Sequence, residues 1–325
     1  MNSTFAARRS ALSSRAQRGI CCLSVLVSAV VVSARTNTST KRPRIRGIEC
    51  VRVYVSDLAR AKDFYAKLYG VRLWGGACDD DSGKCFTVGW FRGQKIELEE
   101  RRNHETKNFL ASITFGTDDI KLMRSYLVSR GVDATKITRD NYGKSVLASH
   151  FDIHDPEGNR IRFIQRSCYA IDDPGPGDPF IVQIIHAGRV VHDRATMDRF
   201  YKDILGFHLY WQGGRKDDET DWINMQIPDG TDWIEYMLNV PADADRHTLG
   251  VMNHIALGVP DIHAAEAQLR KNGWTGTEQP KIGRGGKWQL NLYDPDDTRI
   301  EFMEFTPVQR PCCSGYTGPH PGPKQ

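Results

Sequence analysis

Apolar and polar positions alternate along the chain in a pattern that divides it into short strands and amphipathic helices. In "CVRVYVSDLARAKDFYAKLYGVRLW" and "HAGRVVHDRATMDRFYKDILGFHLYW", an apolar strand leads into a helix that opens after Asp57 or Asp193 and closes at Gly70 or Gly206. The distance from strand to closing glycine is the same in both, from residue 50 to 70 and from 186 to 206. The two segments therefore represent one repeated unit.

A second pair of segments repeats the same order of elements. "SITFGTDDIKLMRSYLVSRG" and "HIALGVPDIHAAEAQLRKNG" each predict a strand and then a helix, over residues 112–131 and 254–273. Each is followed by alternating strand patterns that include a proline-containing turn, in "HDPEGNRIRFIQ" and "YDPDDTRIEFME". The chain thus contains four strand-helix-strands units, paired over residues 47–168 and 181–306, and we predict an α+β fold.

The segments outside these pairs have the composition of connections. "DDPGPGDP" lies within residues 169–180, which we interpret as a linker, and we expect residues 307–325 to form a disordered tail. An Arg-bearing start precedes an apolar run that ends at Ala34, so we expect residues 1–34 to be an export signal, cleaved near Ala34 to give a periplasmic or secreted protein. Targeting to an organelle is the alternative. The run is shorter than the roughly 20 residues of a spanning helix, so we expect no stable membrane anchor.

Charge is distributed unevenly between the leader and the rest of the chain. Residues 1–46, whose last part we interpret as a basic linker over 35–46, hold nine Lys and Arg and no acidic residue. The chain has 44 basic and 40 acidic residues in all, so 35 basic face 40 acidic residues beyond Arg46. A mildly acidic folded part argues against nucleic acid as a partner.

No C-x-x-C pair occurs, which excludes a zinc-finger or thioredoxin-type site. Cys78 and Cys85 could pair if the protein is exported, or stay unpaired.

Four βαβββ modules in two pairs resemble the vicinal oxygen chelate superfamily, which includes glyoxalase I, bleomycin-resistance proteins and type I extradiol dioxygenases. The resemblance covers nearly all of the chain from Gly47 to Phe305. It implies that each pair of modules forms one domain with a cupped, mixed sheet. It also implies that metal ligands come from the first and last strands of each module. A repeat alone indicates only the fold.

The second pair of modules carries metal-ligand chemistry at all four of these positions, namely His186, Glu235, His254 and Glu301. An isolated strand histidine is usually a hydrogen-bonded core residue, and an isolated glutamate is usually solvated. Four such residues at four repeat-defined positions instead predict one bound divalent cation, because a carboxylate on an apolar strand needs a counter-charge. Two carboxylates and two imidazoles favour Zn²⁺, Ni²⁺, Co²⁺, Fe²⁺ or Mn²⁺ over Ca²⁺.

The first pair of modules provides an internal comparison, because the repeat places Cys50, Glu97, Ser112 and Arg162 at the four ligand positions. A cation there would meet Arg162, so we predict no metal in the first domain. We interpret Glu97 as a surface acid, and packing, homodimer contact or shaping of access as roles open to this domain. The histidines that we assign to the surface are His192, His208, His247 and His263.

A strand close to the predicted site offers groups for a substrate. In "GKWQLNLYDP", alternation places Lys287, Gln289 and Asn291 on one face, which parity assigns to the side of Glu301. We expect Gln289 and Asn291 to support the metal or to contact substrate. Arg284 and Lys287 in "IGRGGK" could meet an anionic substrate, or the loop could simply be solvated.

Three functions remain open for a small-molecule substrate with two adjacent oxygens. The ligand set resembles that of glyoxalase I, which implies an isomerase or lyase that moves a proton through an enediolate, with Glu301 as the base. Pairing of a metal-free domain with a metal-bearing one instead resembles extradiol (catechol) dioxygenases. Those enzymes bind iron through two His and one Glu, and carry a Tyr where this chain has Asn291. The third is a non-catalytic binding protein similar to the bleomycin-resistance proteins.

Overall fold

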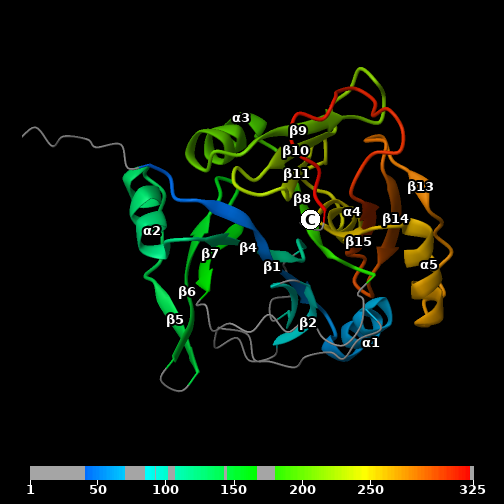
Figure 1. The fold of residues 1–325 in the computed structure, drawn as a ribbon, viewed down its shortest axis with the longest axis horizontal. Coiled ribbons are helices and arrows are strands. Elements are labelled where there is room, and N and C mark those ends of the chain that lie inside the picture. The colour runs from blue at the N-terminus through cyan, green and yellow to red at the C-terminus, as the bar shows by residue number, and fades with distance from the viewer. Residues whose placement is uncertain are drawn as a thin grey trace, which may run out of the picture. The chain divides into compact units, whose positions relative to one another are not determined.

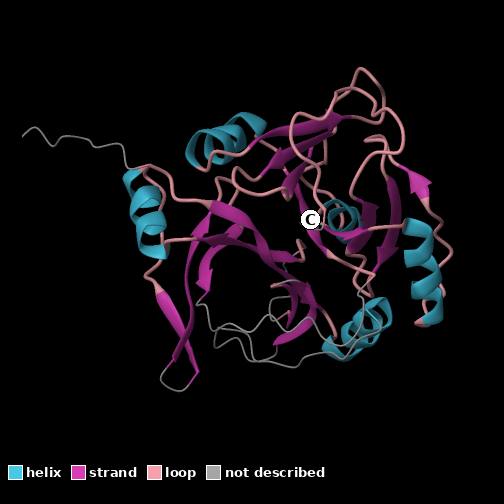
Figure 2. Cartoon of the chain, in the orientation of Figure 1, coloured by secondary structure: helices cyan, strands magenta, loops and turns pink. Residues whose placement is uncertain are grey.

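The computed structural model describes residues 41–69, 85–91, 93–101, 107–142, 145–166 and 180–322 (Figures 1 and 2). The expected α+β fold is confirmed: two mixed sheets are accompanied by helices in the order that the repeats predict. The predicted export signal, Cys78 and most of the predicted linker lie outside the described residues. No described helix is long and apolar enough to span a membrane.

The first pair of modules forms one seven-stranded sheet, in the order β2-β3-β1-β4-β7-β6-β5. Its strands are β1 (Ile45–Val55), β2 (Cys85–Phe91), β3 (Gln94–Glu100), β4 (Leu110–Thr117), β5 (Thr138–Tyr142), β6 (Ser145–His154) and β7 (Arg160–Arg166). The first strand of each module pairs in parallel with its last, β1 with β3 and β4 with β7. The modules join through the antiparallel pair β1 and β4.

The second pair repeats this plan in an eight-stranded sheet, in the order β13-β14-β15-β12-β8-β11-β10-β9. Its strands are β8 (Gln183–Val190), β9 (His208–Gly213), β10 (Trp222–Gln226), β11 (Trp233–Met237), β12 (Ile255–Val259), β13 (Lys281–Ile282), β14 (Trp288–Tyr293) and β15 (Arg299–Glu304). Parallel pairing of β8 with β11 and of β12 with β15 places the predicted ligand strands in the middle of the sheet.

One helix follows the first strand of every module, and an aspartate caps each N-terminus. These helices are α1 (Leu58–Tyr69), α2 (Ile120–Ser129), α3 (Arg194–Asp198), which continues as a π-helix, η1 (Arg199–Ile204), and α5 (Ile262–Lys271). The carboxylates that accept first-turn N–H groups belong to Asp57, Asp119, Asp193 and Asp261. Glycines with positive φ follow three of the helices, at Gly131, Gly206 and Gly273. A further helix that the sequence analysis did not predict, α4 (Arg246–Met252), precedes β12.

The main apolar core contains residues of both sheets and of their helices. The proline-containing turn of each half accepts a tyrosine hydroxyl from the other half. Tyr201 in η1 donates to Asp155 at 3.4 Å, and Tyr65 in α1 donates to Asp294 at 3.3 Å. The tyrosines that the sequence places in equal register therefore have equivalent partners, which ties the two halves together.

The prediction of a disordered C-terminal tail is wrong for residues 307–322, which we call the C-terminal strap (red in Figure 1). Trp211 donates its indole N–H to the carbonyl of Cys312 at 3.2 Å, and Gln226 donates its amide to the carbonyl of Pro319 at 2.8 Å. Adjacent cysteines within the strap, Cys312 and Cys313, form a disulfide. Composition alone indicated disorder because these hydrogen-bond partners are about one hundred residues away in sequence.

Candidate metal centre

The structure brings all four predicted ligands to one face of the second sheet. His186 in β8 lies opposite Ala256 of β12, which in turn lies opposite Glu301 of β15. His254 immediately precedes β12 and exchanges backbone hydrogen bonds with Gly188. Alternation holds as expected, because the neighbours of Glu235 and Glu301 along β11 and β15 belong to the apolar core on the opposite face.

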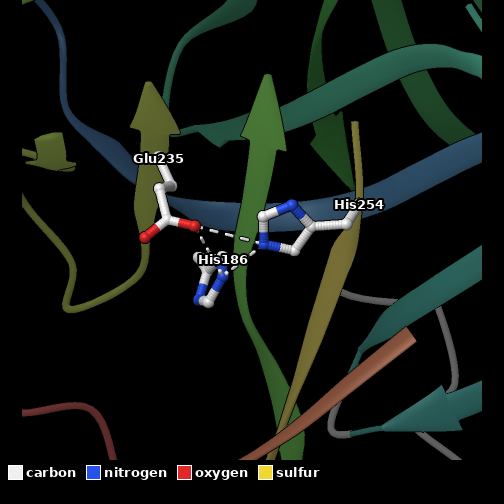
Figure 3. Close-up of side chains that lie close together, drawn as sticks. All are labelled: His186, Glu235 and His254. Atoms are coloured by element: carbon white, nitrogen blue, oxygen red, sulfur yellow. Dashed lines mark hydrogen bonds and ion pairs between the residues drawn. The ribbon is translucent and has the colours of Figure 1, made fainter. Parts of the chain in front are cut away.

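The donor atoms of His186, Glu235 and His254 lie close together (Figure 3). The Nε2 atoms of His186 and His254 are 3.0 Å apart. Oε2 of Glu235 is 3.7 and 3.2 Å from these two nitrogens. Oε2 of Glu301 is 3.6 and 3.4 Å from the same nitrogens. His186, Glu235 and His254 form the compact group of three, which Glu301 approaches through both imidazoles.

Burial sets the protonation of this cluster. Both imidazoles have no exposed surface, and Glu301 is only 3% exposed. Burial lowers the pKa of His186, so its imidazole is neutral and has a free lone pair. Burial opposes ionisation of Glu235 and Glu301, but the imidazoles outweigh it and hold the pKa of both carboxyls below the usual range. Although burial and Arg299 act against it, the two carboxylates raise the pKa of His254.

This donor set fits a divalent cation. Ligand bonds of about 2.0–2.2 Å in a tetrahedron give donor-donor separations of roughly 3.3–3.6 Å, and the His–His and His–Glu separations of 3.0–3.7 Å bracket that range. His254 Nδ1 lies 2.9 Å from the carbonyl of Met252, the type of contact that orients a ligating imidazole. His186 Nδ1 is buried and has no partner among the described residues.

Further residues contact the cluster, and the sequence analysis missed them. In the amide orientation that satisfies both partners, Asn224 of β10 donates to Oε1 of Glu235 at 3.0 Å and accepts from the indole of Trp233 at 3.2 Å. Trp233 in turn stacks on His186, with ring centres 4.6 Å apart. The guanidinium of Arg299 lies 2.8 Å from the nitrogens of His254. No sequence motif marks these residues, because only strand register brings them to the site.

Room for His254 depends on a glycine in the adjacent strand. A Cβ at Gly188 would lie 2.0 Å from Cε1 and Nδ1 of His254, so no larger residue fits without moving the ring. In the ladders, Gly188 pairs with Glu235 as Arg52 pairs with Glu97 in the first sheet. The position that has no side chain in the second half, Gly188, therefore carries an arginine, Arg52, in the first half.

The interpretation of Glu97 as a surface acid is wrong, because Glu97 is 3% exposed. Its carboxylate contacts the guanidinium of Arg52 at 2.8 Å and the ammonium of Lys95 at 2.5 Å. Burial raises its pKa, but Lys95 and Arg52 outweigh burial and lower the pKa to about 2. By strand register, the first sheet has Cys50, Ser112 and Arg162 at the positions that His186, His254 and Glu301 occupy in the second sheet, as the repeat alignment predicts. In the first sheet, the guanidinium of Arg52 thus supplies the counter-charge for the glutamate. The second sheet has no such guanidinium at the equivalent position, Gly188.

A cavity of about 560 Å³ opens beside the four ligands, and its wall includes Glu235 and Glu301. All four residues predicted to meet a substrate line it, namely Arg284, Lys287, Gln289 and Asn291. Asn291 lies directly opposite Glu301 in the β14–β15 ladder, so the predicted parity is confirmed. Lys287 is 2% exposed rather than solvated.

The histidines predicted to lie at the surface are exposed, namely His192, His208, His247 and His263.

The chain is similar to proteins of known chemistry. A lactoylglutathione lyase of Haemophilus influenzae is 30% identical over 125 residues, which is 38% of this chain and 93% of that protein. A variant of homoprotocatechuate 2,3-dioxygenase from Brevibacterium fuscum matches with a TM-score of 0.61 at 17% identity, covering 81% of this chain and 72% of that one. The complex of that enzyme with 3,4-dihydroxyphenylacetate matches with a TM-score of 0.59, covering 81% and 82%.

The structural matches at 17% identity show a shared fold alone. Sequence comparison goes further, because one family model matches residues 47–163 and again residues 183–302, which together make up more than half of the chain. The chain belongs to the Glyoxalase/Bleomycin resistance protein/Dioxygenase superfamily.

Proposed function

We propose that this protein is a metal-dependent enzyme of the glyoxalase I type, an isomerase or lyase that acts on a small molecule with two adjacent oxygens. The observation that carries the proposal is the convergence of two buried imidazoles with the buried carboxylate of Glu301 and the partly buried carboxylate of Glu235, with His–His and His–Glu donor separations of 3.0–3.7 Å. His186, Glu235, His254 and Glu301 would hold one divalent cation. A first-row divalent ion such as Zn²⁺ suits this donor set.

The bound cation would act as a Lewis acid toward two adjacent substrate oxygens. Glu301 would take a proton from one substrate carbon and return it to the next. Its position supports this role, since Glu301 lies at the cavity wall with Asn291 opposite it in the ladder. Lys287 and Gln289, on the same face, would contact the substrate. The likeness to a lactoylglutathione lyase supports this reaction class.

An extradiol dioxygenase is the second candidate, favoured by the fold likeness to homoprotocatechuate 2,3-dioxygenase over 81% of the chain. Glu235 argues against it. Its Oε2 lies 3.2 Å from Nε2 of His254, so a fourth protein ligand would occupy a position that oxygen chemistry needs to be open.

The test compares Glu301→Gln with Glu235→Gln in full-length protein loaded with metal. Activity is screened on hemithioacetals, 2-oxo acids and catechols, and metal content is measured on the same samples. Each substitution removes one charge from the cluster, but only Glu301→Gln removes the proposed base, which is worth about 10²–10⁴-fold in rate. We expect Glu301→Gln to lose far more rate than metal.

Three results would overturn the proposal. Full activity of Glu301→Gln at full metal loading would move the role of base elsewhere. Ring opening of a catechol by the Fe²⁺ form would establish the dioxygenase. Turnover of no compound in any metal form would favour a binding protein.

A further inference from the structure

The wall of the cavity beside the metal centre is strongly cationic. It contains six basic side chains and only two carboxylates, Glu235 and Glu301. A divalent cation would neutralise these carboxylates, so they would not compensate the positive charges at the wall. The six basic residues are Arg215, Lys281, Arg284, Lys287, Arg299 and Arg310.

Some of these cations already have partners. Arg215 forms an ion pair with Asp221 at 3.0 Å, Arg284 forms one with Asp217, and Arg299 lies 3.8 Å from Glu301. Lys281, Lys287 and Arg310 have no carboxylate within ion-pair distance among the residues that the structure describes. Lys281 and Arg310 are exposed, so water solvates their charges. Lys287 differs because it is buried.

Lys287 lies in an aromatic cage. Its Nζ is 3.2 Å from the hydroxyl of Tyr210, and 5.3, 5.0 and 5.1 Å from the ring centres of Tyr210, Trp233 and Tyr316. Aromatic faces attract an ammonium but do not replace the water that it loses. Burial lowers the pKa of Lys287 to about 7, although Glu301 acts in the opposite direction. The cage thus leaves a desolvated cation that an anion would stabilise.

The cage is next to the metal centre. Trp233 contacts Lys287 and also stacks on His186, so the same indole contacts the ammonium and a candidate metal ligand. The C-terminal strap completes the cage, because the hydroxyl of Tyr316 donates to the carbonyl of Gly285 at 2.8 Å. A second strap contact, from Val308 N–H to the carbonyl of Gly286 at 2.8 Å, holds the loop that carries Lys287.

We propose that the cavity takes an anionic substrate whose negatively charged group binds Lys287, while its two adjacent oxygens face the metal centre. The placement of the two oxygens at the metal centre rests on the proposed function. The binding of the charged group to Lys287 rests on the aromatic cage alone. Indole rings at the wall, from Trp211, Trp222 and Trp233, provide apolar surface for the part of the substrate between these two ends.

A matched pair of ligands tests this on full-length protein loaded with Zn²⁺. 3,4-Dihydroxybenzoate and 3,4-dihydroxybenzamide offer the same adjacent oxygens, but only the first carries a charge. Binding is followed by quenching of tryptophan fluorescence. We expect the acid to bind about tenfold or more tightly than the amide. Lys287→Met should reduce this ratio to about threefold or less, whereas Lys287→Arg should retain much of it.

Arg215→Met is the control, because Arg215 lines the same cavity but is already paired with Asp221. We expect it to leave the ratio unchanged. Equal binding of acid and amide by the unaltered protein would overturn the proposal, whatever the variants do. An equal loss in Arg215→Met and Lys287→Met would also overturn it, because bulk charge would then be responsible. Neither result depends on turnover, so failure of the proposed reaction leaves this test intact.

Discussion

Gly188 gives the sharpest prediction about the metal centre. In Gly188→Ala, the new Cβ would lie 2.0 Å from Cε1 and Nδ1 of His254. Ordinary carbon contacts begin near 3.5 Å, so the ring or the strand must move by more than about 1 Å. Metal-ligand bonds tolerate deviations of only about 0.2 Å. We therefore expect His254 to be lost as a ligand.

The magnitude follows from comparison with weaker perturbations. Loss of a residue that merely orients a ligand costs about 10–100-fold in metal affinity. Displacing the ligand itself should exceed this, so we expect Gly188→Ala to weaken Zn²⁺ binding by about 100-fold or more. Competition with a chromophoric chelator measures the affinity, and chemical denaturation of the metal-free protein measures stability.

Gly258→Ala provides a matched control on the adjacent strand β12. Its Cβ would lie 2.3 Å from Phe305 and 2.7 Å from Ile185, which are not predicted ligands. Both variants should lose about 1–3 kcal/mol of stability through overpacking, but only Gly188→Ala should lose metal. A Zn²⁺ affinity within about threefold of the parent in Gly188→Ala would refute the reasoning, as would an equal loss of affinity in Gly258→Ala.

The other predictions concern the first sheet, its titration and the strap. Glu97→Gln should destabilise the protein by about 3–5 kcal/mol, because it leaves Arg52 and Lys95 buried without their counter-charge; unchanged denaturation curves would contradict this. Because the pKa of Glu97 is lowered from 4.5 to about 2 on folding, its contribution of roughly 3 kcal/mol is present above pH 4.5 and lost as the pH falls through about 2. The free energy of unfolding, measured by denaturation from pH 6 to pH 2, should therefore fall less steeply in Glu97→Gln than in the parent. Removal of residues 307–325 should lower the melting temperature and expose cavity tryptophans to iodide, whereas unaltered quenching would show that the strap covers nothing.

Local sequence patterns were sufficient for most of the elements and for the four candidate ligand positions. Alternation and capping aspartates depend on neighbouring residues, so they predict strands and helix starts correctly. The four candidate ligands could be singled out because the modules repeat, and the repeat supplies the register that a single strand lacks. Asn291 was assigned correctly to the face of Glu301 for the same reason.

Long-range pairing decided what the sequence could not predict. The charged segment "KIELEE" indicates a solvated Glu97, and only the β1–β3 register reveals its buried partner Arg52. The burial of Lys287 depends on Tyr316, which lies 29 residues further along in a segment whose composition indicated disorder. Neither contact leaves a periodic signal, because each depends on how distant segments fold against one another.

Equilibrium dialysis of the full-length chain against Zn²⁺ tests the central claim most directly. Two homologous sheets could hold two ions, but Arg52 fills the first, and among the described residues the cluster of imidazole and carboxylate donors lies in the second. We predict one tightly bound Zn²⁺ per chain, lost in His186→Ala and retained in Cys50→Ala at the equivalent position. Two ions per chain, none, or one ion that survives His186→Ala would contradict the account.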